Sequence, residues 1–440
     1  MSNTASLKRT EHAPLSAAFT REGVATAIAA LLLTIVLVSF RPFQPDGSGT
    51  SGSDIVNQIG FGALGAISAF CLLTLADPRT VRSLLSPSWL VMLIFFGLSV
   101  SRAIDPASAL RAASFTLIGI MTMATVLALP RDAEAFSKVL VFTAAVVIGL
   151  SYIGLVVFPN EAMHTANSSE PDQAGLWRGV FTHKNIAGPV MACFSFAGLY
   201  LFRRGRRWAG AAIFIAAMIF ILNTGSKTTA AVVPLSILIV MLPGLIGMRL
   251  GTPILFGLAI VTTAIGTLGI VFLPPLSHLA ATYFPDLTYT GRTTIWEFAG
   301  EMLAQRPWTG YGYDSFWGSP MLLNQDQPFD RAWDVRNIVH GHDGYLDIAV
   351  IMGIPALCVA AYTFVYAPMR DYMRIPLRKE NIWLGDFFMM VVLFTALNAF
   401  LESFFFRRAD PVWMLFVLAA FGLRQVSLRP IPVRGFPHAA

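Results

Sequence analysis

The chain has 440 residues, of which 55% are hydrophobic and 13% are charged, and its formal net charge is +6. This composition excludes a water-soluble globule, because the apolar residues gather in runs long enough to cross a bilayer, which takes about 20 residues per helix. The runs do not alternate apolar and polar residues, as the strands of a membrane barrel do. The sequence therefore predicts an all-α, polytopic bundle of membrane helices.

In chain order, the apolar runs predict about twelve transmembrane helices between polar segments. The predicted parts are a tail at 1–23, nine helices within 24–273, a large polar segment at 274–344, three helices within 345–424 and a second tail at 425–440. The predicted spans are 24–40, 54–76, 88–104, 110–129, 136–158, 185–202, 208–223, 228–248, 251–273, 345–368, 382–401 and 410–424. We expect the large polar segment to contain short amphipathic helices and to fold back over the bundle.

Basic residues favour the cytoplasmic side of a membrane, and two clusters stand out, at 203–207 and 370–379. Placing both clusters inside puts both termini in the cytoplasm and the segment 274–344 outside. The first apolar run lacks a small-residue cleavage site after it, which is typical of an uncleaved anchor. The positive charge is thus explained by anchoring at the inner leaflet, and no basic and aromatic pattern indicates nucleic-acid binding.

Two outer loops carry cations at the water boundary. Arg178, His183 and Lys184 precede the sixth predicted span, and Lys227 lies in the next outer turn. Arginine offers a bidentate fork to phosphate oxygens, and lysine offers a point charge. These residues predict an anion site. The alternatives are anchoring of the first three in the headgroup layer and snorkelling of Lys227 to the interface.

In the large outer segment, Thr294 and Glu297 predict a capping box that starts an amphipathic helix, and Pro307 ends it. Arg292 lies just before the predicted start. The free amides and dipole of a helix N-terminus already favour anions, so an added arginine predicts a phosphate site. An ion pair of Arg292 with Asp286 or Glu297 is an equally supported interpretation.

His340 and His342 lie just before the tenth predicted span. Histidine is the usual general base near neutral pH, and in a glycosyl transfer either one would take the proton of an attacking sugar hydroxyl. Asp343 and Asp347 are close enough in sequence to orient an imidazole. A two-residue spacing of histidines also occurs at metal sites, but no third and fourth ligands follow with suitable spacing.

The last outer turn contains Glu402 and Arg407. A carboxylate at the membrane edge is costly unless it is paired, and Arg407 is the partner that we expect. A structural ion pair is one interpretation of these residues, and contact of Arg407 with substrate is the other.

Five motifs follow one another on the predicted outer side of the membrane. They are Arg178-Gly179-x-Phe181-x-His183-Lys184-Asn185, Gly225-Ser226-Lys227-Thr228, Thr290-Gly291-Arg292-x-x-x-Trp296, Arg306-Pro307-x-x-Gly310-x-Gly312 and His342-Asp343-Gly344-Tyr345-Leu346-Asp347. In this order they resemble the O-antigen ligase and Wzy-type polymerase family, over residues 85–424. The His-Lys-Asn and Ser-Lys-Thr variants, with Glu402-Ser403, are most similar to ExoQ-type exopolysaccharide polymerases. The family commonly has His-Asn where this chain has His342-Asp343.

The resemblance implies an integral-membrane glycosyltransferase of the GT-C kind, which needs no metal, nucleotide sugar or other cofactor. Its donor would be a glycan on undecaprenyl diphosphate. By the same resemblance, Arg178 and Arg292 hold the diphosphate and His342 is the base toward the acceptor hydroxyl. The other candidates for contact with substrate are Lys184, Lys227, His183, His340 and Arg407. The implied partners are lipid-linked donor and acceptor glycans, membrane lipids, and proteins of export and chain-length control.

The predicted function is polymerisation of lipid-linked repeat units into exopolysaccharide at the periplasmic face of a bacterial inner membrane. One alternative is a ligase that transfers a finished glycan to lipid A core, because the motifs of the two activities overlap. Another is a transporter or flippase of lipid-linked saccharides. That alternative requires charged groups near the bilayer midplane, whereas the charged residues of this chain are concentrated at the ends of the spans.

Overall fold

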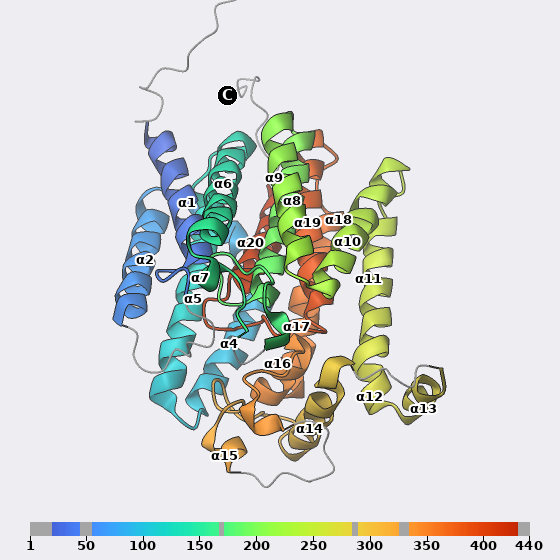
Figure 1. The fold of residues 1–440 in the computed structure, drawn as a ribbon. Helices are drawn as coiled ribbons and strands as arrows, with labels where there is room; N and C mark the ends of the chain where they lie inside the picture. Colours follow the sequence, from blue (N-terminus) through green and yellow to red (C-terminus); the bar gives the residue numbers. More distant parts are fainter. Residues whose placement is uncertain (1–19, 45–54, 167–170, 284–288, 325–333, 430–440) are drawn as a thin grey trace, which may run out of the picture.

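The computed structural model describes residues 20–44, 55–166, 171–283, 289–324 and 334–429. Within these ranges the chain forms helices and turns, and the sole β-type pairing is an isolated bridge between Met163 and Trp177. Long helices stand side by side, and the shorter α14, α15 and α16 gather at one end (Figure 1). The predicted all-α fold is therefore confirmed.

The helices have the following bounds: α1 Arg21–Val38, α2 Ile55–Thr74, α3 Pro78–Leu84, α4 Pro87–Ser101, α5 Pro106–Ala128, α6 Ala133–Val157, α7 Pro159–Ala162, α8 Lys184–Arg203, α9 Arg207–Asn223, α10 Lys227–Leu245, α11 Gly251–Ala264, α12 Ile270–Phe272, α13 Pro274–Tyr283, α14 Arg292–Gln305, α15 Pro320–Leu323, α16 Gly344–Met352, α17 Ile354–Ala361, α18 Ala367–Met373, α19 Lys379–Asn398 and α20 Pro411–Leu428. Single π-helical turns join α11 to α12 and α17 to α18. Short 3-10 turns lie at Pro171–Gln173, Tyr289–Gly291 and Val335–Asn337.

Nine of the described helices are long and apolar enough to cross a membrane, or ten if α3 and α4, which meet at 66°, form one broken span. The prediction of about twelve spans is higher because three predicted runs are short or interrupted. One run is α4, which is bent against α3; another is α9, with 17 residues; the third is divided between α16 and α17. The chain is a polytopic all-α membrane protein.

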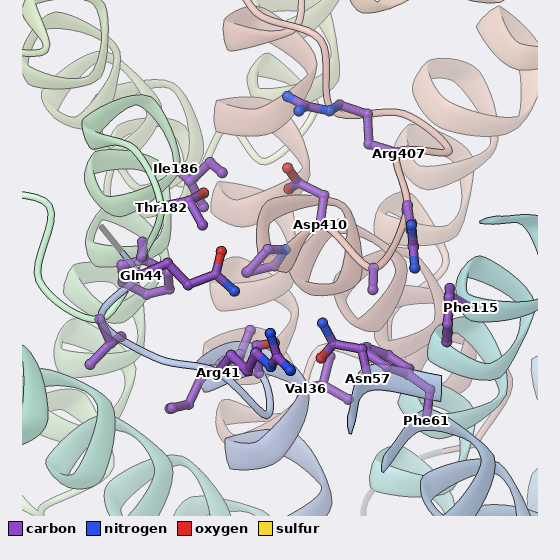
Figure 2. Close-up of a pocket in the computed structure, with 18 residues that line it drawn as sticks. Val36, Arg41, Gln44, Asn57, Phe61, Phe115, Thr182, Ile186, Arg407 and Asp410 are labelled. Atoms are coloured by element: carbon purple, nitrogen blue, oxygen red, sulfur yellow. The ribbon is translucent and has the colours of Figure 1, made fainter. Parts of the chain in front are cut away.

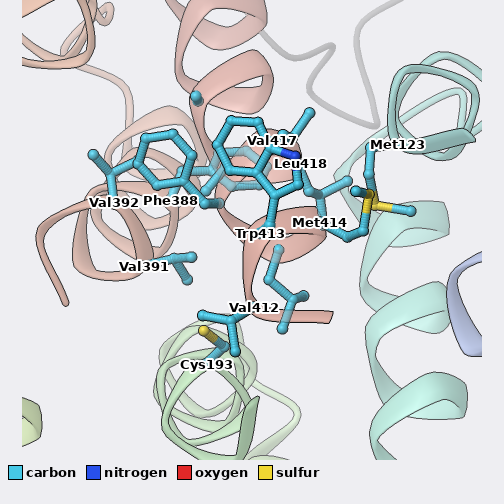
Figure 3. Packing of buried hydrophobic residues seen from close by; sticks show 14 of the residues in the cluster. Met123, Cys193, Phe388, Val391, Val392, Val412, Trp413, Met414, Val417 and Leu418 are labelled. Carbon is cyan, nitrogen blue, oxygen red and sulfur yellow. The ribbon is translucent and has the colours of Figure 1, made fainter. Parts of the chain in front are cut away.

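The centre of the bundle is formed by α8, α19 and α20, whose side chains are almost all buried. Figure 3 shows Trp413 and Met414 of α20 packed among side chains of α5, α8 and α19. Gly422 permits the close approach of α20 to α19, because an added Cβ would lie 2.4 Å from the ring of Phe388. Lipid tails are as apolar as core side chains, so helices in a membrane associate through such close packing.

The break between α16 and α17 is held open by the loop of residues 306–312, which contains one of the five motifs. Gly353 at the break has φ 89°, and an added Cβ would lie 2.5 Å from the carbonyl carbon of Trp308. The amide of Ile354 donates a hydrogen bond to the carbonyl of Pro307 at 2.7 Å. The loop thereby satisfies backbone groups that the interrupted helix leaves unpaired, and this contact sets the position of α16.

Helix α14 begins earlier than the sequence predicts. Gly291 precedes it in the left-handed conformation, φ 82°, and Arg292 is its first residue. Thr294 is buried inside the first turn, so the predicted capping box is wrong. The local pattern fits a cap at Thr294, but glycine takes a positive φ at low cost and lets the helix start three residues sooner. The end at Gln305, ahead of Pro307, agrees with the prediction.

Candidate active site

A buried carboxylate, Glu402, lies where four segments of the chain meet at one end of the bundle. It is in the turn between α19 and α20, and it accepts hydrogen bonds from Nδ2 of Asn185 at 2.8 Å and from Nη2 of Arg292 at 2.9 Å. Nδ1 of His342 lies 3.4 Å from its other oxygen. Asn185 is in the first turn of α8, Arg292 opens α14, and His342 precedes α16. We call these four residues the Glu402 cluster.

The loop that carries His342 is held rigidly. His342 has φ 52°, which is uncommon for a residue other than glycine. On its N-terminal side, the carbonyl of Gly341 accepts from Nε1 of Trp296 at 3.0 Å, and the amide of Gly341 donates to Oδ1 of Asp347 at 3.1 Å. Backbone conformations of this kind persist only where the surroundings enforce them, and they gather at functional sites.

Asp343 and Asp347 have different roles from the predicted one. Asp343 caps α16, with Oδ1 accepting from the amides of Tyr345 and Leu346 at 3.0 and 2.8 Å. Oδ1 of Asp347 accepts from Nε1 of Trp317 at 2.7 Å as well as from Gly341. The carboxylate within ion-pair distance of the His342 imidazole is Glu402. The expectation that Asp343 or Asp347 orients the histidine is therefore wrong.

The pKa values of Glu402 and of the neighbouring His340 are both lower than usual. Burial raises the pKa of Glu402, but the adjacent His342, whose Nδ1 lies 3.4 Å away, and the electrostatic effects of Arg292 and His183 outweigh burial and hold that pKa below its ordinary value of 4.5. Burial, followed by the charges of Arg407 and His342, lowers the pKa of His340 well below its usual range. At neutral pH the site therefore contains a carboxylate at Glu402 and a neutral imidazole at His340.

The cluster has the parts needed for proton transfer beside an anion. A carboxylate next to Nδ1 of His342 favours the tautomer with its proton there, so that Nε2 is free to accept a proton. The same carboxylate stabilises the imidazolium that then forms. Among the described residues, Nε of Arg292 is buried without a hydrogen-bond partner. The guanidinium thus retains a donor for a bound anion after pairing with Glu402.

Arg178, predicted to hold the diphosphate, is fully buried in the loop before α8. Its Nη2 donates to the carbonyl of Gln44 at 2.8 Å, and its Nη1 donates to the carbonyls of Thr182 and Phe181 at 3.2 and 3.4 Å. These contacts tie the loop to the turn after α1. A direct contact with a diphosphate requires this loop to move, and the predicted binding role of Arg178 stays a prediction.

His183 and Lys184 lie at the start of α8, next to Asn185. Nδ1 of His183 accepts from the amide of Asn185 at 3.1 Å and so caps the helix. The amide of Lys184 donates to Nε2 of His164 at 3.2 Å, and the rings of His164 and His183 have centroids 4.7 Å apart. Nδ2 of Asn185 donates to Glu402, and His183 is among the groups that lower the pKa of Glu402, so the loop reaches the cluster through His183 and Asn185.

Lys227 begins α10 and is exposed. The turn before it is joined to the loop of Arg178, because the amide of Trp177 donates to the carbonyl of Asn223 at 3.0 Å. The structure thus brings the two outer loops together, as the predicted shared anion site requires. In the described contacts, Lys227 itself does not join the Glu402 cluster.

Arg407 does not pair with Glu402, so that prediction is wrong. Its Nη1 donates to the carbonyl of Ser403 at 3.3 Å, while Glu402 pairs with Arg292. Arg292 likewise does not pair with Glu297, which is exposed on α14, and Asp286 lies outside the described residues. The charge of Arg407 still lowers the pKa of His340, which places it beside the cluster.

Sequence reasoning does not identify Glu402 and Asn185 as site residues. A signal for Glu402 exists, because an acidic residue at a membrane edge needs a partner. The partner lies 110 residues away in the chain, and no local pattern connects the two. The signal for Asn185 is its place after His183 and Lys184 in one of the five motifs.

Comparison with known proteins agrees with the resemblance seen in the motifs. Residues 210–361 match a family model, Wzy_C, described as O-antigen ligase. The chain carries an O-antigen ligase domain. The matched residues run from α9 to α17 and include Arg292 and His342. No curated protein matches the chain.

The O-antigen ligase domain confirms the predicted O-antigen ligase and Wzy-type family, whereas the ExoQ-type branch stays a prediction. The family implies a membrane enzyme, ligase or polymerase, that transfers lipid-linked glycans. Together with the helices that can cross a membrane, the O-antigen ligase domain supports a multi-pass membrane enzyme of this kind.

Proposed function

We propose that the protein is a metal-independent glycosyltransferase that polymerises undecaprenyl diphosphate-linked repeat units into exopolysaccharide. The observation that carries the proposal is the Glu402 cluster, which joins a candidate base, His342, to a cation with a spare donor, Arg292. The cluster lies in a chain with an O-antigen ligase domain. A base and a cation are the two groups that a sugar transfer from a diphosphate requires.

In the proposed step, a hydroxyl of the acceptor sugar attacks the anomeric carbon of the donor glycan. A new carbon–oxygen bond forms there, and the bond from that carbon to the diphosphate oxygen breaks. The bonding electrons leave with undecaprenyl diphosphate, and the hydroxyl proton passes to Nε2 of His342. Glu402 orients the imidazole and stabilises its charge. Arg292 stabilises the negative charge that grows on the leaving diphosphate.

The remaining predicted residues surround this step. Arg178 positions the loop that presents Asn185 to Glu402, because its hydrogen bonds join this loop, at Thr182, to the turn after α1, at Gln44. The candidates for contact with glycan or diphosphate near the cluster are Lys184, Lys227, His183, His340 and Arg407. Among these, His340 is the less suitable base, since its lowered pKa disfavours holding a transferred proton.

We place the cluster at the periplasmic face of a bacterial inner membrane. Support comes from the opposite end of the bundle, where Arg203, Arg204 and Arg206 lie together with Glu134 and Asp386. Basic residues favour the cytoplasmic side. Polymer made at the outer face would then pass to proteins of export and chain-length control.

Ligation of a finished glycan to lipid A core is a second candidate, favoured by the description of the matching family model as O-antigen ligase. The same cluster would serve this reaction with a different acceptor. The ExoQ-like motifs at Lys184, Lys227 and Glu402 lead us to place polymerisation first.

The test uses the purified full chain in detergent with an undecaprenyl diphosphate-linked repeat unit, without nucleotide or added metal. Wild type is expected to give longer glycans and free undecaprenyl diphosphate, and folded His342→Ala and Arg292→Ala are expected to give neither. Glycan appearing on lipid A core, with no longer chains from the lipid-linked unit alone, would establish the ligase instead. Intact substrate with either acceptor would reject both transfer reactions.

A further inference from the structure

A pocket of about 420 Å³ is lined in part by the loop that leads to Asn185 and by the turn between α19 and α20, which carries Glu402. It is bounded by the end of α1, the start of α2, α5 and the loop before α8. Figure 2 shows Arg41, Gln44, Asn57 and Arg407 around this space. The end of α1 and the start of α2 belong to helices that can cross a membrane, so the pocket lies at a membrane boundary.

Among the described residues, the polar lining of the pocket has more cationic than anionic side chains. Three of its described lining residues are arginines, Arg41, Arg407 and Arg408, and Asp410 is the one carboxylate among them. Oδ1 of Asp410 accepts from the amides of Val412 and Trp413 and thereby caps α20. Guanidinium groups suit the oxygens of a phosphate or diphosphate, so the charge of the pocket fits such a group.

The rest of the lining is apolar. Leu37 of α1, Phe61 of α2, Phe115 of α5 and Ile186 of α8 contribute to it. The guanidinium of Arg408 lies 4.4 Å from the ring centre of Phe115, so a cation and an aromatic wall meet at one point. A ligand with a phosphate-bearing head and an apolar chain would match both parts of the lining.

The pocket is connected to the candidate active site through residues that the two share or that bridge them. Arg407 lines the pocket and also influences the pKa of His340. Arg178 donates to the carbonyls of Gln44 and Thr182, both of which line the pocket. A ligand head bound here would therefore lie against the loop that leads to Asn185 and the turn that carries Glu402.

We propose that this pocket holds the diphosphate of a second polyprenyl-linked glycan, the acceptor, while the donor diphosphate lies at Arg292. The proposal rests on the function proposed above, because a polymerase acts on two lipid-linked substrates at once. The acceptor keeps its own diphosphate bond during transfer, and only its sugar hydroxyl loses a proton, to His342. The pocket thus adds a binding site for a diphosphate that stays intact beside the site where one is released.

The experiment measures how the rate depends on the donor and on the acceptor separately. The full-length enzyme is given an undecaprenyl diphosphate-linked donor together with either a lipid-linked acceptor unit or the same oligosaccharide released from its lipid. In Arg41→Gln/Arg408→Gln, we expect the half-saturating concentration of the lipid-linked acceptor to rise about tenfold or more. The half-saturating concentration of the donor and the rate with lipid-free acceptor should stay within about twofold of wild type.

Arg111→Gln is the matched control, because Arg111 is an exposed arginine of α5 that does not line the pocket; it should change neither quantity. An unchanged acceptor dependence in the double variant, or an equal loss for donor and acceptor, would overturn the inference. An effect seen only when phosphatidylglycerol is added would assign the pocket to a phospholipid headgroup and would also overturn it. Wild type that forms no product with either acceptor would instead reject the proposed function.

Discussion

The two ends of the bundle both carry paired charges, but the pairs are arranged differently. At the basic end, defined by Arg203, Arg204 and Arg206, every carboxylate of the network has a close arginine partner. Arg204 joins Glu134 at 2.6 Å to Glu380 at 2.8 Å, and Arg203 joins Asp386 at 2.6 Å. This end ties α6, α8 and α19 together.

At the other end, one carboxylate serves three groups. Glu402 faces Asn185, Arg292 and His342, while Nε of Arg292 and Nδ1 of His340 are buried without hydrogen-bond partners among the described residues. Buried polar groups in proteins are nearly always satisfied, and exceptions call for an explanation. A charged network whose members all have close partners stabilises the fold. One that leaves buried donors or acceptors without partners is arranged to bind a ligand.

Among substitutions at the two ends of the bundle, removal of the candidate base should cause the largest loss of glycan-transfer rate. We expect His342→Ala to reduce the rate of glycan transfer by about 10³-fold, because general acid–base catalysis contributes about 10²- to 10⁴-fold. The rate is measured with saturating donor and acceptor. His278→Ala, an exposed histidine of α13, is the control and should retain full activity. Comparable activity in His342→Ala would show that another group takes the proton.

Glu402→Gln should have the next largest effect. It preserves the shape of the side chain but removes the charge that orients His342 and stabilises its protonated form, so we expect about a hundredfold loss of rate. A purely structural role for Glu402 would lower the unfolding midpoint and leave the rate of the folded protein close to that of wild type. Glu297→Gln, on the exposed face of α14, is the matched control.

The same carboxylate gives a stability prediction with a definite sign. The pKa of Glu402 is lower in the folded protein than its ordinary value of 4.5. Its ionisation therefore stabilises the fold above pH 4.5, and this contribution is lost as the pH falls through the lower, folded pKa. Thermal unfolding in detergent over this acidic range should depend less on pH in Glu402→Gln than in wild type. An identical pH dependence would contradict the assigned charge.

Two glycine-to-alanine substitutions, one at each end of the bundle, test how tightly the backbone is packed there. An added Cβ at Gly341 would lie 2.4 Å from Oδ1 of Asp347, whereas one at Gly205, in the turn between α8 and α9, meets nothing within 4 Å. Gly341→Ala should displace the His342 loop and reduce the rate about tenfold. Gly205→Ala should cost about 1 kcal/mol of strain from its positive φ and leave the rate unchanged. Equal rates in the two variants would show that the loop tolerates displacement.

Arg204→Gln should have the smallest effect on catalysis and a clear effect on stability. The Arg204 side chain is 11% exposed, and its loss deprives Glu134 and Glu380 of a shared partner, at a cost of about 3 kcal/mol. Unfolding midpoints in detergent report this loss. Turnover of the folded fraction should stay within about twofold of wild type, because distant sites act additively. A large loss of turnover at unchanged stability would contradict the assignment of catalysis to the Glu402 end and of stabilisation to the basic end.

The fold class and most helix positions could be predicted from the sequence because apolar runs report directly on membrane spans. Interruptions were harder to predict. The run at 345–368 is apolar apart from Asp347, yet it breaks at Gly353, because the loop of residues 306–312 packs into that point. An interruption of this kind depends on a partner segment, which hydropathy alone does not contain.

The candidate site could be predicted in part. His342 and Arg292 follow from residue type and placement, and the structure brings them to one carboxylate. The identity of that carboxylate could not be predicted, because its partners are distant in the sequence. Glu402 is separated from Asn185 by 217 positions and from Arg292 by 110. Local patterns suggested Arg407 and Glu297 as ion-pair partners, but tertiary packing selected the pair of Arg292 with Glu402.

The central claim is that the Glu402 cluster carries out glycan transfer, and a single-turnover rate tests it most directly. Wild type, His342→Ala and Arg204→Gln are compared in one preparation, with lipid-linked donor and acceptor and with rates normalised to folded protein. The single-turnover rate of His342→Ala should be about 10³-fold lower than that of wild type, and the rate of Arg204→Gln should equal that of wild type. Transfer by folded His342→Ala at the wild-type rate would contradict the central claim.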